Sequence, residues 1–416
     1  MVKHIFKMIW NQRKSNSWLL GELLLVFVCL WYIVDYFLVV LYTFNAPVGF
    51  DLSHTYRFLF NAREEGAEGY VTMEEHPATV GDDLWEAIDR LRRMPEVEAV
   101  SFSRFGIPYN TMDNYISLRA DTLSEGVACR LYYVSPSYFE LYRIRPASGY
   151  KGELKDGLSD RAIVITEDAA AKLFPGENAV GKRVYLQNGN DPLEIGAVTR
   201  TGRGSEFERV RQQAYLYQGE SDVKAFPGEM LPWAEVSVRV KPEAEKDFAE
   251  KFMTEKSGQV ELGNLYLQNI TPLSSTREDA LREGKSDMKT RVFILFFLLL
   301  NIFLGIIGTF WFRTRQRQGE MGLRMALGST RSRLRITVLS EGVFLLTVAF
   351  VPALLICLNI ALLDLTSTGL LDNTILRFAG GIILTYLLIV GMIIAGVWYP
   401  ANEAASLEPA EALHYE

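Results

Sequence analysis

Four long apolar runs constrain this chain more than any other feature of its sequence. They occupy residues 18–43, 291–313, 336–361 and 378–398. Each is about 20 residues or longer, the length that an α-helix needs to cross a bilayer. Residues 44–290, between the first two runs, have an ordinary globular composition. The sequence therefore predicts an integral membrane protein of four transmembrane helices with one large domain outside the bilayer.

The first apolar run is predicted to be an uncleaved anchor. It is longer than the hydrophobic part of a signal peptide, it contains Glu22 and Asp35, and no small-x-small cleavage site follows it. Residues 1–17 are then an N-terminal segment of the mature protein.

The distribution of arginine predicts the orientation. Residues 313–335 contain seven arginines and one acid, Glu320, and the N-terminal segment is also basic. Because cytoplasmic loops carry the excess of Lys and Arg, residues 1–17, 314–335 and 399–416 are predicted to be cytoplasmic. The large domain and the short loop 362–377 then lie on the other side of the membrane.

The large domain is acidic. Phe44–Arg291 contains 40 acidic and 31 basic side chains, a net charge of −9, which argues against a nucleic-acid or phosphate-rich partner. Cys129 is its only cysteine, so an intrachain disulfide within the domain is excluded and a hydrophobic core must stabilise it.

Two β-α-β patterns flank a long insertion in this domain. The first reads "TYRFLF", "DDLWEAIDRLRRM" and "VEAVSFSRF", and the second reads "AEVSVRV", "KPEAEKDFAEKFMTEKSG" and "QVELGNLYLQNI". Strand, helix and strand in this order predict a split β-α-β-β-α-β sheet of the ferredoxin-like type. The fold class is therefore an α+β membrane protein with a mixed α/β outer domain.

The insertion, residues 106–233, carries strands and short helices of its own and predicts a second, mixed subdomain. Its segment "RAIVITEDAAAKLFPG" predicts a strand followed by a helix capped by Thr166. The segment "SSTREDALREGKSDMKTR" contains residues 274–290. It predicts a charged helical stalk that continues into the second span.

The motif "GENAVGKR" resembles a phosphate loop but lacks its context. A helix precedes it and a strand follows, the reverse of a nucleotide-binding loop, and Arg183 stands where Ser or Thr must bind Mg²⁺. None of the four histidines has a metal-ligand spacing, and no nucleophile elbow is found. These patterns predict no catalytic site, no metal site and no cofactor on this chain.

Polar and small residues within the spans are candidates for contacts between helices. Asp35 is either a coupling contact or a hydrated or protonated acid near the outer leaflet, and its position favours the second reading. Asn301 predicts an interhelical hydrogen bond, and Pro352 predicts a kink. The remaining candidates are four glycines that would permit close helix packing and dimerisation: Gly380, Gly381, Gly391 and Gly396.

The cytoplasmic loop contains a short apolar helix, "GEMGLRMALG", among its arginines. Gly328 marks its end, and Ser329 or Thr330 begins the next helix. A helix this short is marginal in water and needs a docking surface. The residues alone leave two surfaces open: anionic lipid headgroups and a groove on a partner protein.

Several segments together resemble the MacB/FtsX/LolC-type ABC transporter permeases. The segment "GEMGLRMALGSTRSRL" is similar to the loop signature of that family, and "YPANEAASLEPAEAL" to its closing pattern, without the usual arginines. In the outer domain, "VSPSYFELYRIRPASG", "AIVITEDAAAKLFPGENAVGKRV" and "LEIGAVT" resemble the MacB-like periplasmic core domain.

This resemblance implies an inner-membrane permease with its large domain in the periplasm, working by mechanotransmission. Its expected partners are a separate cytoplasmic ABC ATPase that binds ATP and Mg²⁺, a second permease copy, a periplasmic adaptor and an outer-membrane duct. The ATPase-docking role falls on the short loop helix: Glu320, Met321, Gly322, Leu323, Arg324, Ala326, Leu327 and Gly328. The alternative is an FtsX-like regulator that relays the state of the ATPase to a periplasmic cell-wall hydrolase.

Overall fold

The computed structural model describes residues 13–110, 112, 114–121, 124–187, 191–316, 319, 323, 329–365 and 369–406. The chain divides into two compact units. One is a core domain, Ala46–Gly284, and the other is a membrane unit formed by Met1–Asn45 and Lys285–Glu416. Each unit has hydrophobic clusters of its own.

Four antiparallel strands and two helices of the core domain form the predicted ferredoxin-like subdomain. The elements are β1 (Thr55–Ala62), α3 (Val80–Arg92), β2 (Val97–Arg104), β9 (Glu235–Val240), α7 (Phe248–Glu255) and β10 (Leu265–Pro272). The strands lie in the order β10-β1-β9-β2, and every neighbouring pair is antiparallel. This topology confirms the split β-α-β-β-α-β prediction.

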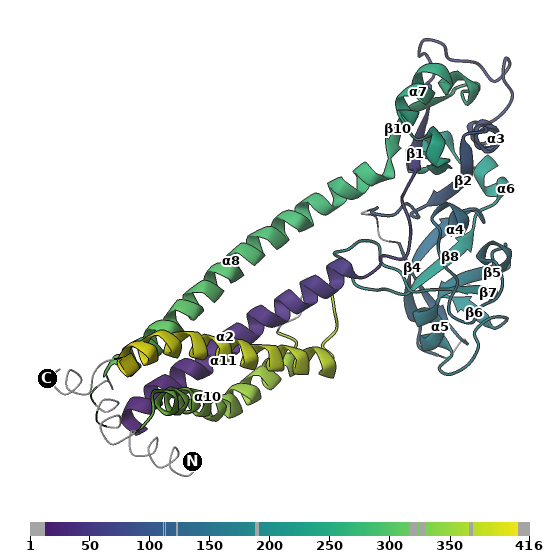
Figure 1. Ribbon diagram of the computed structural model, residues 1–416. Helices are drawn as coiled ribbons and strands as arrows, with labels where there is room; N and C mark the ends of the chain where they lie inside the picture. The colour runs from purple at the N-terminus through teal and green to yellow at the C-terminus, as the bar shows by residue number, and fades with distance from the viewer. Residues whose placement is uncertain are drawn as a thin grey trace. The chain divides into compact units, whose positions relative to one another are not determined.

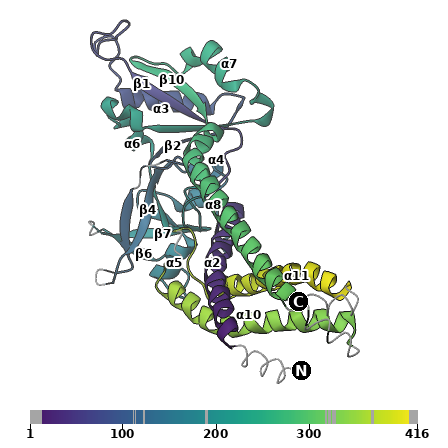
Figure 2. The same ribbon diagram turned by 90° about the vertical axis from the view of Figure 1, so that its left-hand side faces the viewer.

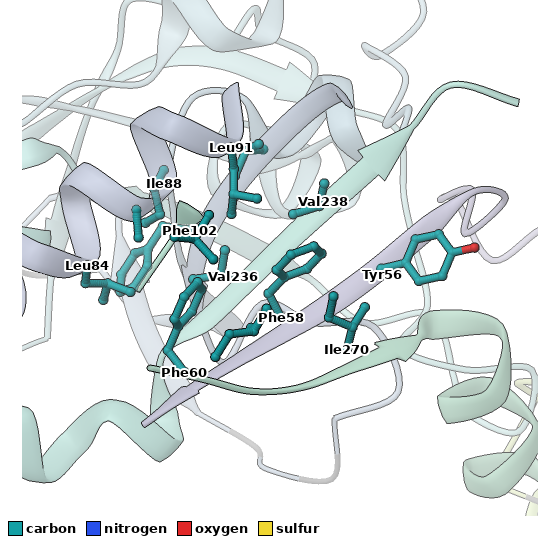
Figure 3. Packing of buried hydrophobic residues seen from close by; sticks show 14 of the residues in the cluster. Tyr56, Phe58, Phe60, Leu84, Ile88, Leu91, Phe102, Val236, Val238 and Ile270 are labelled. Carbon is teal, nitrogen blue, oxygen red and sulfur yellow. The ribbon is translucent and has the colours of Figure 1, made fainter. Parts of the chain in front are cut away.

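One face of this sheet packs against α3 and α7. Alternate β1 residues, Tyr56, Phe58 and Phe60, point into the cluster, which Leu84 and Ile88 enter from α3 (Figure 3). Strand residues two apart share a face, and helix residues four apart share a face, so both patterns place apolar side chains in the same layer. The intervening strand residues point to the opposite face.

The inserted subdomain is a closed barrel of six strands. These are β3 (Tyr115–Arg119), β4 (Val127–Val134), β5 (Ala162–Thr166), β6 (Arg183–Leu186), β7 (Leu193–Thr199) and β8 (Gln213–Tyr217). They follow the order β4-β3-β6-β7-β5-β8, and a parallel pairing of β4 with β8 closes the ring. Among the described residues, each barrel strand thus pairs with a neighbour on both sides. Figure 2 shows β4, β6 and β7 gathered beside α5.

Pairing of β2 with β4 joins the barrel to the ferredoxin-like sheet, through Ser103 with Val134 and Arg104 with Tyr133. The short helices of the domain are α4 (Tyr138–Leu141), α5 (Glu167–Leu173) and α6 (Glu220–Lys224), with 3-10 turns η1 (Leu154–Gly157), η2 (Gly228–Trp233), η3 (Pro242–Ala244) and η4 (Ser257–Gln259).

Thr166 takes the N-cap position of α5, but its side chain makes no cap hydrogen bond. Its hydroxyl instead accepts a hydrogen bond from the Gln213 backbone N–H at 3.0 Å. The predicted cap position is confirmed, but the hydroxyl does not bond the first turn of the helix, because β8 lies close enough to compete for it.

The segment "GENAVGKR" is a helix-to-strand turn between α5 and β6, as predicted. Lys182 forms an ion pair with Glu177, and its ammonium lies 4.6 Å from the centre of the Phe174 ring. Lys182 therefore interacts with Glu177 and Phe174, which precede it in the chain.

In the described part of the chain, four helices are long and apolar enough to cross a bilayer. They are α2 (Arg13–Asn45), α8 (Leu273–Gln316), α10 (Arg331–Leu362) and α11 (Ile375–Ser406). Helix α8 starts directly after β10 and runs without interruption for 44 residues (Figure 1). Helix α10 is N-capped by Thr330 and continues as one helix through Pro352.

Residues of α2, α8, α10 and α11 share one buried cluster that includes Phe27, Phe310, Leu346 and Ile393. Two of the four predicted packing glycines lie against a neighbouring helix. A Cβ added at Gly396 would be 3.0 Å from the Ile307 Cα, and one at Gly381 would be 3.1 Å from the Trp31 Nε1. Gly380 and Gly391 face open space within the chain.

Candidate functional site at the root of the long helix

A loop of the barrel binds both chain segments that connect the core domain to membrane helices. We call residues 201–208, between β7 and β8, the junction loop. The segments it binds are the residues that follow α2 and the first turns of α8. Its contacts determine how firmly α8 is attached to the core domain.

Arg277, in the second turn of α8, is held by an acid and a phenol. Its Nε donates to the Glu206 Oε1 at 2.9 Å, and its Nη2 donates to the same oxygen at 2.5 Å. The Tyr109 hydroxyl donates to the other Glu206 oxygen at 2.8 Å. Glu206 is buried and Arg277 is half-exposed, so the Arg277 guanidinium covers the Glu206 carboxylate on its solvent side.

The environment keeps Glu206 ionised. Burial by itself would raise the pKa of this carboxyl, but hydrogen bonds from Arg277 and Tyr109 outweigh burial and hold the pKa below its usual value. Burial and the hydrogen bond to Glu206 raise the pKa of the Tyr109 phenol. The cluster therefore contains a carboxylate, a guanidinium and a neutral phenol, which is a stable charge pattern at neutral pH.

The same loop binds the chain that follows α2. The Arg203 backbone N–H donates to the Val48 carbonyl at 2.9 Å, and the Arg203 guanidinium donates to the Ala46 carbonyl. Gly49 has a φ of +101°, and a Cβ there would be 3.1 Å from the Gly202 Cα. The two backbones approach this closely because both residues are glycines.

The junction loop is itself fixed to the barrel. The Thr201 hydroxyl donates to Glu167 of α5 at 2.9 Å, and Arg130 of β4 forms an ion pair with Glu208 at 3.0 Å. A displacement of the first turns of α8 would thus be resisted by the barrel through side chains at both ends of this loop.

In the membrane unit, Asp35 of α2 and Arg377 of α11 form a buried ion pair. The Arg377 Nε and Nη2 donate to the two Asp35 oxygens at 2.9 and 2.5 Å, and Nη1 donates to the Leu371 carbonyl at 2.8 Å. Both side chains are less than a tenth exposed. This two-point geometry links two predicted spans at one end of α11.

The structure corrects two interpretations of intramembrane residues. Asp35 was expected to be a hydrated or protonated acid, but it pairs with a guanidinium. Asn301 was expected to bond another helix, but its amide donates to the Phe297 carbonyl at 2.7 Å, one turn earlier in α8, and the side chain is exposed. This bond uses one of the two amide N–H groups, and within the described residues of the single chain the predicted interhelical bond is not formed.

Of the eight predicted ATPase-docking residues, the structure describes Leu323, which is helical and 52% exposed. Glu320, Met321, Gly322, Arg324, Ala326, Leu327 and Gly328 lie outside the described residues. Within the described part of the chain, no three His, Cys, Asp or Glu side chains gather in a way that could hold a metal ion.

Sequence reasoning missed the junction cluster and the partner of Asp35. Arg377 directly precedes the fourth apolar run, and nothing in its neighbouring residues indicates that Asp35, in the first run, is its partner. Tyr109, Glu206 and Arg277 carry no local signal, because they lie in two loops and a helix far apart in the chain.

The fold and its junction define a class: an integral membrane protein of the permease type, whose core domain is inserted between two spanning helices. Residues 48–254 match the family of the MacB-like periplasmic core domain, and residues 292–409 match that of the FtsX-like permease C-terminal domain. The chain belongs to the MacB/FtsX-type permease family.

Two curated relatives carry the name macrolide export ATP-binding/permease protein MacB. The protein from Photorhabdus laumondii is 25% identical over 312 residues, which cover 70% of this chain and 44% of that protein. The protein from Agrobacterium fabrum is 25% identical over 289 residues, covering 67% and 42%. The chain thus spans less than half the length of either relative.

Solved structures of similar domains were also found. The extracellular domain of the noncanonic ABC-type transporter YknZ from Gram-positive bacteria is 19% identical, with a TM-score of 0.31, and covers 52% of this chain and 100% of that domain. The periplasmic region of MacB from Actinobacillus actinomycetemcomitans is 16% identical, with a TM-score of 0.31, and covers 56% and 94%.

Proposed function

We propose that this chain is the permease subunit of a MacB-like ABC transporter that works by mechanotransmission. A separate cytoplasmic ATPase binds and hydrolyses ATP with Mg²⁺, and a second permease copy completes the membrane part. Movement of the spans is relayed to the periplasmic core domain, which moves a substrate outward from the periplasm or the outer leaflet. A periplasmic adaptor and an outer-membrane duct continue the path.

The observation that carries this proposal is the continuity of α8. Its 44 residues join the last strand of the core domain to the far end of the second apolar run. At 1.5 Å per residue such a helix is about 66 Å long. An unbroken helix with a hydrogen-bonded root passes a displacement along its length, whereas a flexible linker would absorb it.

The proposed contact with the cytoplasmic ATPase is based on the loop that follows α8. Leu323 is exposed in a basic segment, and an apolar side chain in that setting favours a protein groove over water. We place both termini in the cytoplasm, in agreement with the arginine distribution. We assign ATPase docking to the same eight residues as above: Glu320, Met321, Gly322, Leu323, Arg324, Ala326, Leu327 and Gly328.

Dimerisation is favoured by surfaces that the single chain leaves uncovered. The apolar run of α8 is the least covered of the four, with Phe293, Phe296 and Phe297 exposed. Gly380 and Gly391 of α11 are eleven positions apart, so they share one helix face, and that face is open. Small residues on an open face allow another helix to approach closely.

Docking is tested with Leu327→Asp, in a chain co-expressed with candidate ATPases and purified in mild detergent. The complex should be lost while membrane insertion is retained. Ser332→Asp adds the same charge at an exposed polar position of the following helix and should leave the complex intact. Survival of the complex with Leu327→Asp would show that the docking assignment is wrong.

Transmission is tested by spin labels in the complete complex. Cys29 is exposed and is first replaced by serine; Cys129 and Cys357 are buried. A label at Asp279→Cys, an exposed position in the stalk, reports the distance between the two copies. ATP should shift that distance in the parent and shift it less in Arg277→Gln. If the distance between the two labels did not change on addition of ATP, mechanotransmission would be ruled out.

The FtsX-like regulator is the second candidate, since residues 292–409, which contain three of the four spans, match the FtsX-like family. Affinity purification from the native membrane, with partners identified by mass spectrometry, separates the two. An adaptor and a duct support export, whereas a cell-wall hydrolase would support regulation.

A further inference from the structure

A cavity of about 590 Å³ lies in the core domain. Arg57, in its wall, alternates with the core residues Tyr56 and Phe58, so it points to the sheet face opposite α3 and α7. The residues that carry the argument come from β1, β2, β9, the 3-10 turn η2 and the loop after β2: Arg57, Arg104, Phe105, Trp233 and Glu235.

Among the described residues of the cavity wall there is one acid, Glu235, and its carboxylate is already hydrogen-bonded. One oxygen of the Glu235 carboxylate accepts hydrogen bonds from the Ser103 hydroxyl at 2.8 Å, the Gly106 N–H at 2.7 Å and the Ile107 N–H at 3.0 Å. The other accepts from the Asn110 amide at 2.9 Å. Four neutral donors stabilise this carboxylate, so it does not require an ion pair with either arginine of the wall.

The two arginines in the wall are left with unused donors. Among the residues that the structure describes, neither Arg57 nor Arg104 has an ion-pair partner within 4.0 Å, and the buried Arg57 Nε has no hydrogen-bond partner. The Arg104 guanidinium lies 5.4 Å from the centre of the Tyr133 ring and 5.9 Å from that of Phe105. Contact with ring faces holds a guanidinium in place without using its N–H groups.

Most of the remaining wall is apolar, apart from Tyr109, Asn110 and Thr276. Phe105, Ile107, Met230 and Pro232 line it, and Trp233 stands 48% exposed at its edge. A volume of this size is within the range of about 300–1,000 Å³ found for small-molecule sites, which combine apolar walls with a few polar groups. A partly buried guanidinium with unused donors matches a carboxylate or a phosphate- or sulfonate-like group.

We propose that this cavity binds a small amphipathic anion, a ring body with one carboxylate, sulfonate or phosphate group. Arg57 and Arg104 bind the acid, and Phe105 and Trp233 contact the body. Residues 44–291 carry a net charge of −9, so the overall field of the domain does not attract anions. Selection of an anion therefore depends on these two arginines. The site is independent of the transport proposal, because its occupancy needs no ATPase.

The cavity also adjoins the junction. Tyr109, which donates to Glu206, and Thr276, next to Arg277 in α8, are both in its wall. A bound anion would therefore contact the root of the long helix.

The test is calorimetric titration of the full chain in nanodiscs with naphthalene-2-sulfonate, and with neutral naphthalene-2-sulfonamide as the matched probe. Empty nanodiscs give the lipid background. The sulfonate should saturate at one site per chain and bind at least about tenfold more tightly than the sulfonamide, since a charge-assisted hydrogen bond is about twice as strong as a neutral one. Equal affinities for the two probes would overturn the proposal.

Variants assign the binding to this cavity. Arg57→Gln and Arg104→Gln should each weaken sulfonate binding about tenfold, the loss expected for one charged hydrogen bond. Arg183→Gln removes the same charge from an exposed position on β6 and should change nothing. Weakening by Arg183→Gln equal to that by Arg104→Gln would mean a general charge effect and would overturn the assignment.

Trp233→Ala provides a variant that should fold normally, because about half of the Trp233 side chain is exposed to solvent. It should weaken both probes by a similar factor, since each has the same ring body. Unfolding temperatures verify that each variant is folded, and unchanged sulfonate affinity in folded Trp233→Ala would also contradict the proposed site.

Discussion

The Arg377 guanidinium donates to both oxygens of the Asp35 carboxylate, across 342 positions of sequence and inside the membrane unit. Removing one partner of a buried pair leaves an uncompensated charge, which costs about 3–5 kcal/mol. Asp35→Ala should therefore lower the unfolding temperature in detergent sharply. Asp35→Leu combined with Arg377→Met should recover most of the loss, because an apolar pair of similar volume leaves no buried charge.

Asp279→Ala, at an exposed position of the stalk, is the matched control and should leave the unfolding temperature unchanged. If Asp35→Ala were as stable as this control, the pair would contribute nothing to the bundle.

Arg277→Gln should loosen the root of α8. The variant loses the charge-assisted hydrogen bonds to Glu206, and a bond to a charged group contributes about 1.5–3 kcal/mol when well shielded. Because the Arg277 side chain is half-exposed, we expect the lower end, an increase of about tenfold in hydrogen exchange of the first turns of α8. Mass spectrometry of exchange in residues 273–284 measures this, with Arg282→Gln, an exposed arginine on the same helix, as control.

The junction should weaken in acid. Glu206 has a folded-state pKa below its usual value, so its contribution is complete above the unfolded pKa of about 4.3 and is lost as pH falls through the folded pKa. The difference in unfolding temperature between the parent and Glu206→Gln should be constant from pH 7 to about 5 and should shrink below about pH 4. A difference that grows on acidification would contradict this sign.

Gly391→Leu should separate dimerisation from folding. A Cβ added at Gly391 would have no atom of a neighbouring element of this chain within 4 Å, so a larger residue fits the single chain. If that face contacts a second copy, the substitution should reduce the dimer fraction seen by light scattering without lowering the unfolding temperature. Gly396→Leu is the contrasting variant: it meets the Ile307 backbone and should destabilise the bundle itself.

Much of the architecture could be predicted because its signals are local. A spanning helix is recognised from about 20 consecutive apolar residues, and all four predicted runs are helical. The strands and helices of the ferredoxin-like subdomain follow from alternation in "TYRFLF" and from the helical spacing of Leu84, Ile88 and Leu91. Thr330 was one of two residues proposed to start α10, and it is the N-cap.

The sequence by itself thus determined the spans, the order of strands and helices, and the position of the insertion, since each depends on the spacing of neighbouring residues. Only the tertiary structure decided that the insertion closes into a barrel through the β4–β8 pairing. It alone decided that Arg377 neutralises Asp35, and that Tyr109 and Glu206 bind Arg277 at the start of α8. These contacts join residues far apart in the chain, and no local periodicity encodes which distant partner a polar side chain will meet.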